Sequence, residues 1–200
     1  MEKLISNLKK RNYLVESFKN KEEALDYLLN QFEPQKSIAW GGSVTLDELG
    51  IKNEIRNKNW IVLNRDNAKT PQEKRDIQIK SFDADYYLLS TSAISEDGLL
   101  VNIDGNGNRL AAFIFGPKKV FVIAGTNKIC KSEEEAMDRV RNIAAPKNTQ
   151  RLKRNTPCAK TGTCHNCLSD DCVCSHIIVT RRSWVKGRVE IILIEEELGF

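Results

Sequence analysis

Apolar residues follow two different spacings along the chain, and the alternation between them predicts a series of helices and strands. Helical spacing, with apolar residues one, three and four positions apart, occurs in three segments, residues 4–8, 24–32 and 136–144. Short uninterrupted apolar runs, typical of strands buried on both faces, occur in four segments, residues 37–40, 60–63, 86–89 and 120–124. The pattern predicts an α/β fold in which helices cover both faces of a mainly parallel sheet.

Capping and turn residues mark the ends of these elements. A hydroxyl residue followed three positions later by glutamate predicts a helix start at three places, Thr45–Glu48, Thr70–Glu73 and Ser132–Glu135. The glycine- and asparagine-rich residues 104–108 predict a hairpin between strands at 99–103 and 110–115.

Residues 147–176 depart from this pattern, since they are polar, poor in apolar residues and rich in cysteine. Strand character returns at 177–179 and 190–194, so the end of the chain is expected to rejoin the sheet. Two hundred residues can bury a sizeable core without disulfides. We therefore expect a single domain over residues 1–200 that carries a cysteine-rich insertion at about 147–176.

Composition narrows the classes of function. The 31 basic and 27 acidic residues leave a net charge of +4, which is too small to indicate nucleic-acid binding, and the densest basic stretch, residues 147–160, is interpreted as a solvated loop. No apolar run approaches the roughly 20 residues of a membrane span, and no signal peptide follows Met1. We expect a cytoplasmic protein, in which clustered cysteines favour metal or redox chemistry over disulfides.

Five of the six cysteines lie close together near the end of the chain, at positions 158, 164, 167, 172 and 174. Their spacing suits tetrahedral zinc or an iron–sulfur cluster, both of which take thiolate ligands. The predicted ligands are Cys158, Cys164, Cys167 and Cys174, with Cys172 as a surrogate for one of them. The alternative is a set of reduced thiols that hold no metal.

Two turns between predicted elements are candidate ligand sites. Gly41, Gly42 and Ser43 follow one buried strand and precede a helix, where free backbone N–H groups favour an anion; the alternative is glycine used only for a tight turn. A second turn follows the strand at 86–89, and ligands of open α/β sheets bind beyond such strand ends. Its candidate residues are Thr91, Ser92, Glu96, Asp97 and Gly98, joined by Asn102 and Arg109 nearby.

Glu96 is the candidate catalytic residue of this second turn, as a nucleophile or a general base. Arg109 can hold a carboxylate or a phosphate with its forked guanidinium, so the predicted ligand is a small anionic metabolite. The alternative is a polar turn in which Glu96 and Asp97 are only solvated.

Three segments resemble the LUD-domain family, which includes the lactate-utilization protein LutC. They are residues 38–46 (IAWGGSVTL), residues 91–98 (TSAISEDG) and residues 115–128, which contain FGPKKV and AGTNK. The similarity extends over nearly the whole chain, and residues 156–174 are similar to a cysteine-bearing branch of the family.

The resemblance implies a fold similar to that of glucosamine-phosphate deaminase (NagB), ribose-phosphate isomerase (RpiA) and the coenzyme A transferases. It also implies a connection with lactate oxidation beside iron–sulfur oxidoreductase subunits. In coenzyme A transferases a Ser-Glu-Asn-Gly turn carries the catalytic glutamate, and Ser95–Gly98 is similar except that Asp97 replaces the asparagine.

Three functions follow as competing hypotheses. The first is an accessory or electron-transfer component of organic-acid utilization, with a metal or iron–sulfur centre held by the cysteines. The second is an enzyme on a phosphosugar or coenzyme A thioester that uses Glu96 and carries a structural zinc. The third is a module that binds and senses a metabolite.

Overall fold

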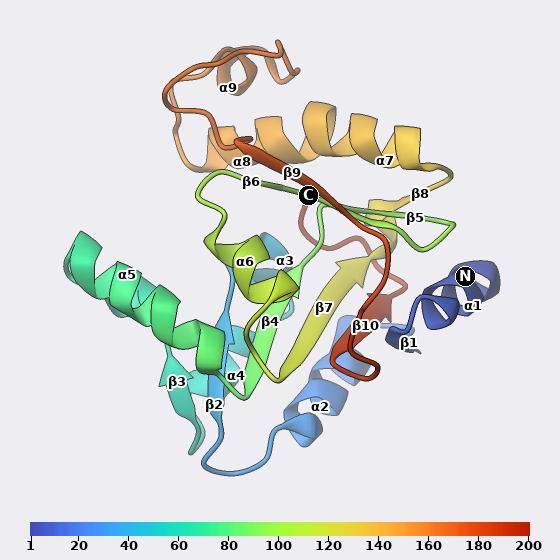
Figure 1. Ribbon diagram of the computed structural model, residues 1–200, viewed down its shortest axis with the longest axis vertical. Coiled ribbons are helices and arrows are strands. Elements are labelled where there is room, and N and C mark those ends of the chain that lie inside the picture. Colours follow the sequence, from blue (N-terminus) through green and yellow to red (C-terminus); the bar gives the residue numbers. More distant parts are fainter.

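The computed structural model describes all 200 residues and contains a six-stranded sheet whose strands are all parallel. The order across this sheet is β1 (Leu14–Phe18), β10 (Val189–Ile194), β7 (Lys119–Gly125), β4 (Tyr86–Ser90), β2 (Ser37–Trp40) and β3 (Ile61–Leu63). The end of the chain therefore inserts between β1 and β7 (Figure 1). The predicted α/β class with a mainly parallel sheet is confirmed.

Helices cover both faces of this sheet and divide the interior into two cores. Along β4, Tyr87 and Leu89 pack into one core, whereas Tyr86 and Leu88 pack into the other, as the alternation of side chains in a strand requires. The first core is closed by α1 (Glu2–Lys10) and α6 (Asn108–Ile114). The second is closed by α2 (Lys21–Gln31), α3 (Val44–Glu48) and α4 (Ile51–Arg56).

A second, smaller sheet stands beyond the carboxyl ends of the parallel strands (Figure 1). Its order is β8 (Ile129–Cys130), β5 (Ala93–Ser95), β6 (Leu100–Asp104) and β9 (His176–Thr180). A long helix covers it, made of α7 (Glu133–Arg139), a π-helical turn at Val140–Ala144 and α8 (Ala145–Arg151). Val101 and Ile103 of the sheet pack against Ala136 and Val140 of the helix.

The wide turn at Val140–Ala144 explains how this helix passes a proline. Pro146 has no N–H, and its ring would clash with the carbonyl of the preceding turn of a regular α-helix. The π-helical turn loosens that part of the helix, so the chain continues as α8 to Arg151. Residues 147–151 are therefore helical, and the cysteine-bearing segment between α8 and β9 contains only the short α9 (Pro157–Thr161).

The predicted hairpin across residues 104–108 is wrong. Residues 108–114 form α6, and the antiparallel neighbours of β6 are β5, which precedes it, and β9, which lies more than seventy residues later in the chain. Gly107 precedes the helix with φ of 78°, which suits glycine, and the turn therefore starts a helix instead of returning a strand. Leu110 and Phe113 lie three positions apart and both enter the first core, a helical spacing within an apolar run.

Two local expectations also need correction. The helix after β2 is capped by Ser43, whose hydroxyl accepts a hydrogen bond from the N–H of Leu46 at 3.3 Å, so Thr45 is not its cap. The strand at Ile61–Leu63 is an edge strand, and Ile61 is 56% exposed, whereas a buried strand was expected. The caps at Thr70, before α5 (Pro71–Lys80), and at Ser132 are confirmed. None of the helices is long and apolar enough to cross a membrane.

Candidate functional site: a cationic cavity at the strand ends

A cavity of about 830 Å³ lies between the carboxyl ends of the parallel strands and the helix that covers the second sheet. Its floor includes Ser43, just after β2, and Ser90 to Ser92, at the end of β4. The chain continues from β2 outward to β3, but from β4 it crosses to β7 on the other side. Open α/β sheets bind ligands at such a reversal of strand order, so this is the position in the fold at which a ligand site is expected.

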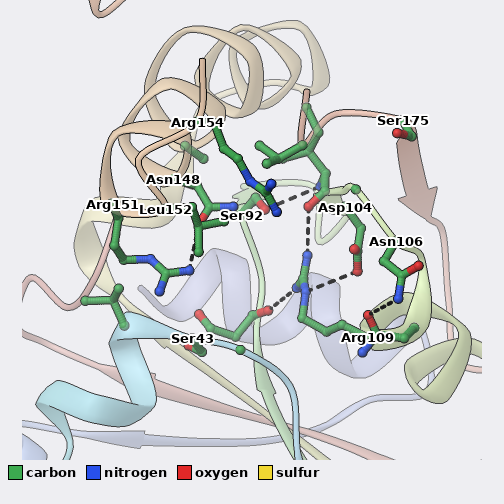
Figure 2. Close-up of a pocket in the computed structure, with 18 of the residues that line it drawn as sticks. Ser43, Ser92, Asp104, Asn106, Arg109, Asn148, Arg151, Leu152, Arg154 and Ser175 are labelled. Carbon is green, nitrogen blue, oxygen red and sulfur yellow. Dashed lines mark hydrogen bonds and ion pairs between the residues drawn. The ribbon is translucent and has the colours of Figure 1, made fainter. Parts of the chain in front are cut away.

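Basic side chains outnumber acidic ones on the cavity wall. The seven basic residues come from several elements: Arg65, Lys74, Arg75, Arg109, Lys128, Arg151 and Arg154. The two acidic residues are Asp104 and Asp170. Figure 2 shows Arg151 and Arg154 descending from the helical side, with Ser43 and Arg109 below them. The excess of basic side chains in a partly enclosed space gives the cavity a positive potential.

Some of these cations are already neutralised within the protein. Arg109 pairs with Asp104 at 3.5 Å between Nε and Oδ2, and Arg154 pairs with Asp171 at 2.9 Å between Nη1 and Oδ1. Three exposed cations form no ion pair with a carboxylate, namely Lys74, Arg75 and Arg151. These three lie on two facing elements, α5 and α8, and are the cations most available to a ligand.

Arg109 ties the floor of the cavity together. Its Nη1 donates to the carbonyl oxygen of Ser90 at 2.8 Å and to Oδ1 of Asn102 at 3.1 Å, and its Nη2 donates to the carbonyl oxygen of Ile103 at 2.9 Å. Burial lowers the pKa of this guanidinium, and the neighbouring carboxylate of Asp104 opposes the shift. With its donors occupied by the protein, Arg109 holds the ends of β4 and β6 in register and adds positive potential to the cavity.

Gly41 is required by the same arginine. A Cβ atom at this position would lie 2.6 Å from Cγ of Arg109 and 2.8 Å from Cδ, which is closer than real contacts allow. The N–H of Gly41 donates to the carbonyl oxygen of Leu88 and continues the sheet. Gly41 therefore lets the Arg109 side chain cross under the turn, while Gly42 and Ser43 reach the cavity wall.

Lys128 is the most deeply buried cation of the cavity and follows β7 in a 3-10 turn at Thr126–Lys128. Its Nζ donates to Oγ of Ser90 at 3.0 Å, to the carbonyl oxygen of Thr91 at 3.2 Å and to the backbone oxygen of Phe200 at 3.3 Å. Burial, and after it the positive charges of Arg139 and Arg109, lower the pKa of Lys128 to about 7. The side chain is therefore poised between an ammonium ion and a neutral amine at neutral pH.

The structure brings together part of the predicted set of site residues. Gly42, Ser43, Thr91, Ser92 and Arg109 all line the cavity. Asn102 lies just behind the wall, where its Oδ1 accepts from Arg109 and from the N–H of Ser92.

Glu96, Asp97 and Gly98 lie outside the cavity, against α1. The carboxylate of Glu96 pairs with Lys3 at 3.0 Å, and its carbonyl oxygen accepts from Asn7. The carbonyl oxygen of Asp97 accepts from Nε of Arg11. A Cβ at Gly98 would lie 3.1 Å from the backbone nitrogen of Leu8, so this glycine admits the helix. The catalytic role of Glu96 stays a prediction, and the positions of these residues give it no contact with the cavity.

The cysteine-bearing segment does not assemble a metal site in this structure. No three side chains of histidine, cysteine, aspartate or glutamate lie close enough to coordinate one ion. Cys158 lies in the first turn of α9, where its Sγ is 3.5 Å from Oγ1 of Thr149 and 3.3 Å from Oγ1 of Thr156. The zinc or iron–sulfur centre stays a prediction, and no chemical step is assigned to it.

Cys172 lies beside Cys174. Burial, and after it the thiols of Cys172, Cys167 and Cys164, raise the pKa of Cys174 to about 11. The spare thiol of the prediction, Cys172, also lines the cavity together with Val173 and Ser175. The cysteine-bearing segment therefore forms part of the cavity wall.

Several cations of the cavity could not be recognised from the sequence. Arg151 and Arg154 belong to the basic stretch that was interpreted as a solvated loop, and Lys74 and Arg75 have the pattern of an exposed helix face. The signals for Lys128 were its position close behind the buried run at 120–124 and its place at the end of the AGTNK segment.

The LUD domain family matches the chain over residues 1–194. In structure, the chain is similar to a DUF162 family protein from Deinococcus radiodurans, with a TM-score of 0.55 and 10% sequence identity over 96% of this chain and 94% of that one. A ribose 5-phosphate isomerase from Plasmodium falciparum gives a TM-score of 0.34 and 16% identity over 56% of this chain and 52% of that one. No curated protein matches the chain in sequence.

Proposed function

The chain belongs to the LUD domain family, and on that premise we propose that it binds a small anionic metabolite in the cationic cavity and serves the utilization of organic acids such as lactate. The observation that carries the proposal is the set of basic residues without acidic partners on facing walls of one cavity. Carboxylates and phosphates share the acceptor geometry that the arginine fork recognises, so both are ligands of the proposed class. Iron–sulfur oxidoreductase subunits are the partners that this setting implies.

The position of the cavity supports this proposal as much as its charge does. It lies where strand order reverses, and its floor presents the hydroxyl groups of Ser43 and Ser92, which can add neutral hydrogen bonds to an anion. Arg75 and Arg151 are exposed at the surface and lie on opposite walls. A ligand between them would be held by charge-assisted hydrogen bonds from both sides.

Replacing Arg75 or Arg151 with glutamine is expected to weaken binding of small anions by about tenfold for each substitution, because each removes one charge-assisted hydrogen bond. Both side chains are exposed, so the fold should be unaffected. Calorimetric titration with lactate, pyruvate and ribose 5-phosphate measures the effect. Binding of the wild-type protein should also weaken as sodium chloride is added, since salt screens the cavity.

Arg182→Gln is the matched control, since Arg182 is an exposed arginine that does not line the cavity. Its binding should equal that of the wild type. The Glu96→Gln variant distinguishes the enzyme hypothesis from our proposal. If the protein turns over any of these probes and Glu96→Gln abolishes turnover, the catalytic residue lies outside the cavity and our proposal fails. It also fails if none of the three anions binds at millimolar concentration.

A metal centre held by Cys158, Cys164, Cys167 and Cys174, with Cys172 as surrogate, is a separate proposal, supported by the spacing of these cysteines in the sequence and by the contact between Cys172 and Cys174. Protein purified without oxygen is expected to contain stoichiometric iron or zinc, detected by elemental analysis and a visible spectrum. A Cys164→Ser, Cys167→Ser double variant should lose the metal. Cys130→Ser, which alters a cysteine buried in the core of the second sheet, should retain it. Wild-type protein free of both metals would contradict the proposal.

A further inference from the structure

The edge strands of the two sheets are protected against pairing with another chain, with one exception. In the main sheet, β3 has only three residues, and β1 carries the exposed Glu16 at its centre. In the second sheet, β8 has only two residues. Edge strands that are short or charged resist pairing, whereas a longer apolar edge offers its free N–H and C=O groups to another strand. The exception is β9.

The edge strand β9 has none of these protections. Its five residues, His-Ile-Ile-Val-Thr, include no lysine, arginine, acidic residue or proline. Its only partner in the sheet is β6, and none of its residues is fully buried. No backbone group of β9 takes part in a hydrogen bond of a turn or loop. The side of β9 that faces away from β6 is therefore open.

The register of the second sheet shows which backbone groups of β9 are unpaired. The N–H of Ser95 donates to the carbonyl oxygen of Leu99, so the alternation of an antiparallel ladder turns the groups of the odd-numbered residues of β6 toward β5. The even-numbered residues of β6 therefore bond to the even-numbered residues of β9, which lie opposite them. The N–H and C=O groups of Ile177 and Val179 are left on the open side.

Apolar side chains surround this open edge. Ile177 packs beside the core under the long helix, whereas Ile178 packs beside the first core on the other face of the sheet. A depression of about 510 Å³ next to Ile178 is also lined by Ile79, from α5, and Ile114, from α6, which are 53% and 54% exposed. Figure 1 shows β9 above α6. A strand that paired with β9 would cover apolar surface as well as backbone groups.

We propose that β9 pairs with β9 of a second copy of this chain, antiparallel and centred on Ile178, which joins the two small sheets into one. This register places Ile177 of each copy opposite Val179 of the other, and such pairs exchange the N–H···O bonds that are otherwise unmade. Apolar residues then meet apolar residues, and His176 meets Thr180, so no like charges oppose each other. The strand is thus complementary to itself, as the shared surface of a two-fold dimer must be, and this identifies a second copy as the occupant.

Sedimentation velocity of the full chain, under reducing conditions, tests the pairing. The wild type should sediment as a dimer at micromolar concentration. Val179→Lys should raise the dissociation constant of the dimer by about tenfold or more, because a lysine on an edge strand opposes pairing. Ile61→Lys is the matched control, since Ile61 is an exposed apolar residue on β3, an edge strand of the main sheet. Its dimer should be as stable as that of the wild type.

Cysteine cross-linking tests the register. In the proposed dimer the two copies of residue 178 form a non-hydrogen-bonded pair with Cα atoms about 4.5 Å apart, within disulfide reach, whereas the two copies of residue 179 are offset along the strands. Under mild oxidation, Ile178→Cys should therefore form an intermolecular disulfide about tenfold faster than Val179→Cys. Peptide mass spectrometry separates this disulfide from those of the native cysteines.

Three results would overturn the inference. The first is a wild-type protein that stays monomeric at about 100 μM, well above the dissociation constants of stable dimers, which would leave β9 to a strand of a different protein. The second is a dimer that Val179→Lys does not weaken, because its interface would then lie elsewhere. The third is a dimer in which residue 178 cross-links no faster than residue 179.

Discussion

Replacing Arg109 with methionine is expected to lower the free energy of unfolding by about 3–5 kcal/mol, the usual cost of removing one partner from a buried ion pair. The side chains of Arg109 and Asp104 are only 13% and 10% exposed. The substitution leaves the Asp104 carboxylate without its cation, and it removes the hydrogen bonds from Arg109 to the carbonyl oxygens of Ser90 and Ile103. Unfolding in urea, followed by circular dichroism, measures the loss.

A second substitution identifies the cause. In an Arg109→Met, Asp104→Asn double variant the uncompensated charge is gone, so part of the lost stability should return. If the single variant loses less than about 1 kcal/mol, the network under the cavity is not the support that the hydrogen bonds indicate. Gly41→Ala should share the defect of Arg109→Met, because its Cβ would push the Arg109 side chain aside.

The main sheet could be predicted because its central strands are short, continuous apolar runs that can be recognised in the sequence. Each of β2, β4 and β7 is buried on both faces, so local composition alone marks it as a central parallel strand. The second sheet could not be predicted in the same way. Its longest ladder joins β6 to β9. No local sequence signal predicts that residues 100–104 pair with residues 176–180.

The turn after β6 shows where local signals mislead. A glycine- and asparagine-rich turn between two apolar runs fits a hairpin and equally fits a strand followed by a helix whose first residues follow a glycine. The choice is made by tertiary packing, since Leu110 and Phe113 reach the core of the parallel sheet only from a helix. Arg109, the first charged residue of that helix, is placed under the cavity by the same choice.

The residues of the candidate site also fall into two groups, those that local sequence signals could predict and those that depend on tertiary packing. Ser43 and Thr91 follow predicted strands. They could be predicted from the sequence because ligand sites of α/β folds lie at the ends of the strands. Arg151 and Arg154 were missed because their position depends on α8 and the residues that follow it, which lie over the strand ends only once the second sheet has formed. A basic segment has no signature of its own that distinguishes a cavity wall from a solvated surface.

The cysteine-bearing segment and the cavity are one structural unit. Cys172 and Val173 line the cavity, and the backbone of Val173 lies 3.2 Å from the position that a Cβ of Gly105 would occupy. Binding of a metal by the neighbouring thiols would therefore fix one wall of the anion site. This connection gives the two proposals a shared consequence: metal loading should change anion affinity, whereas two independent sites would not respond to each other.

Replacing Lys128 with methionine is expected to stabilise the protein most at and below neutral pH. The folded-state pKa of Lys128 is about 7, against 10.5 for an ordinary lysine. Between these values the unfolded chain holds a proton that the folded protein has lost, so the wild-type free energy of unfolding rises with pH across this window. The burial cost is therefore complete below about pH 7 and disappears as pH approaches about 10.5. Methionine fills a similar volume without a charge, so the variant lacks this dependence.

The difference in stability between Lys128→Met and wild type should therefore shrink by about 4 kcal/mol as the pH rises through the window. Urea unfolding at a series of pH values from about 6 to about 10 gives this difference directly, and groups that titrate in both proteins cancel from it. Lys128→Arg is the matched control, because arginine keeps its charge throughout and should add no stability at low pH. Parallel curves for Lys128→Met and wild type would show that Lys128 titrates like an exposed lysine and would contradict the prediction.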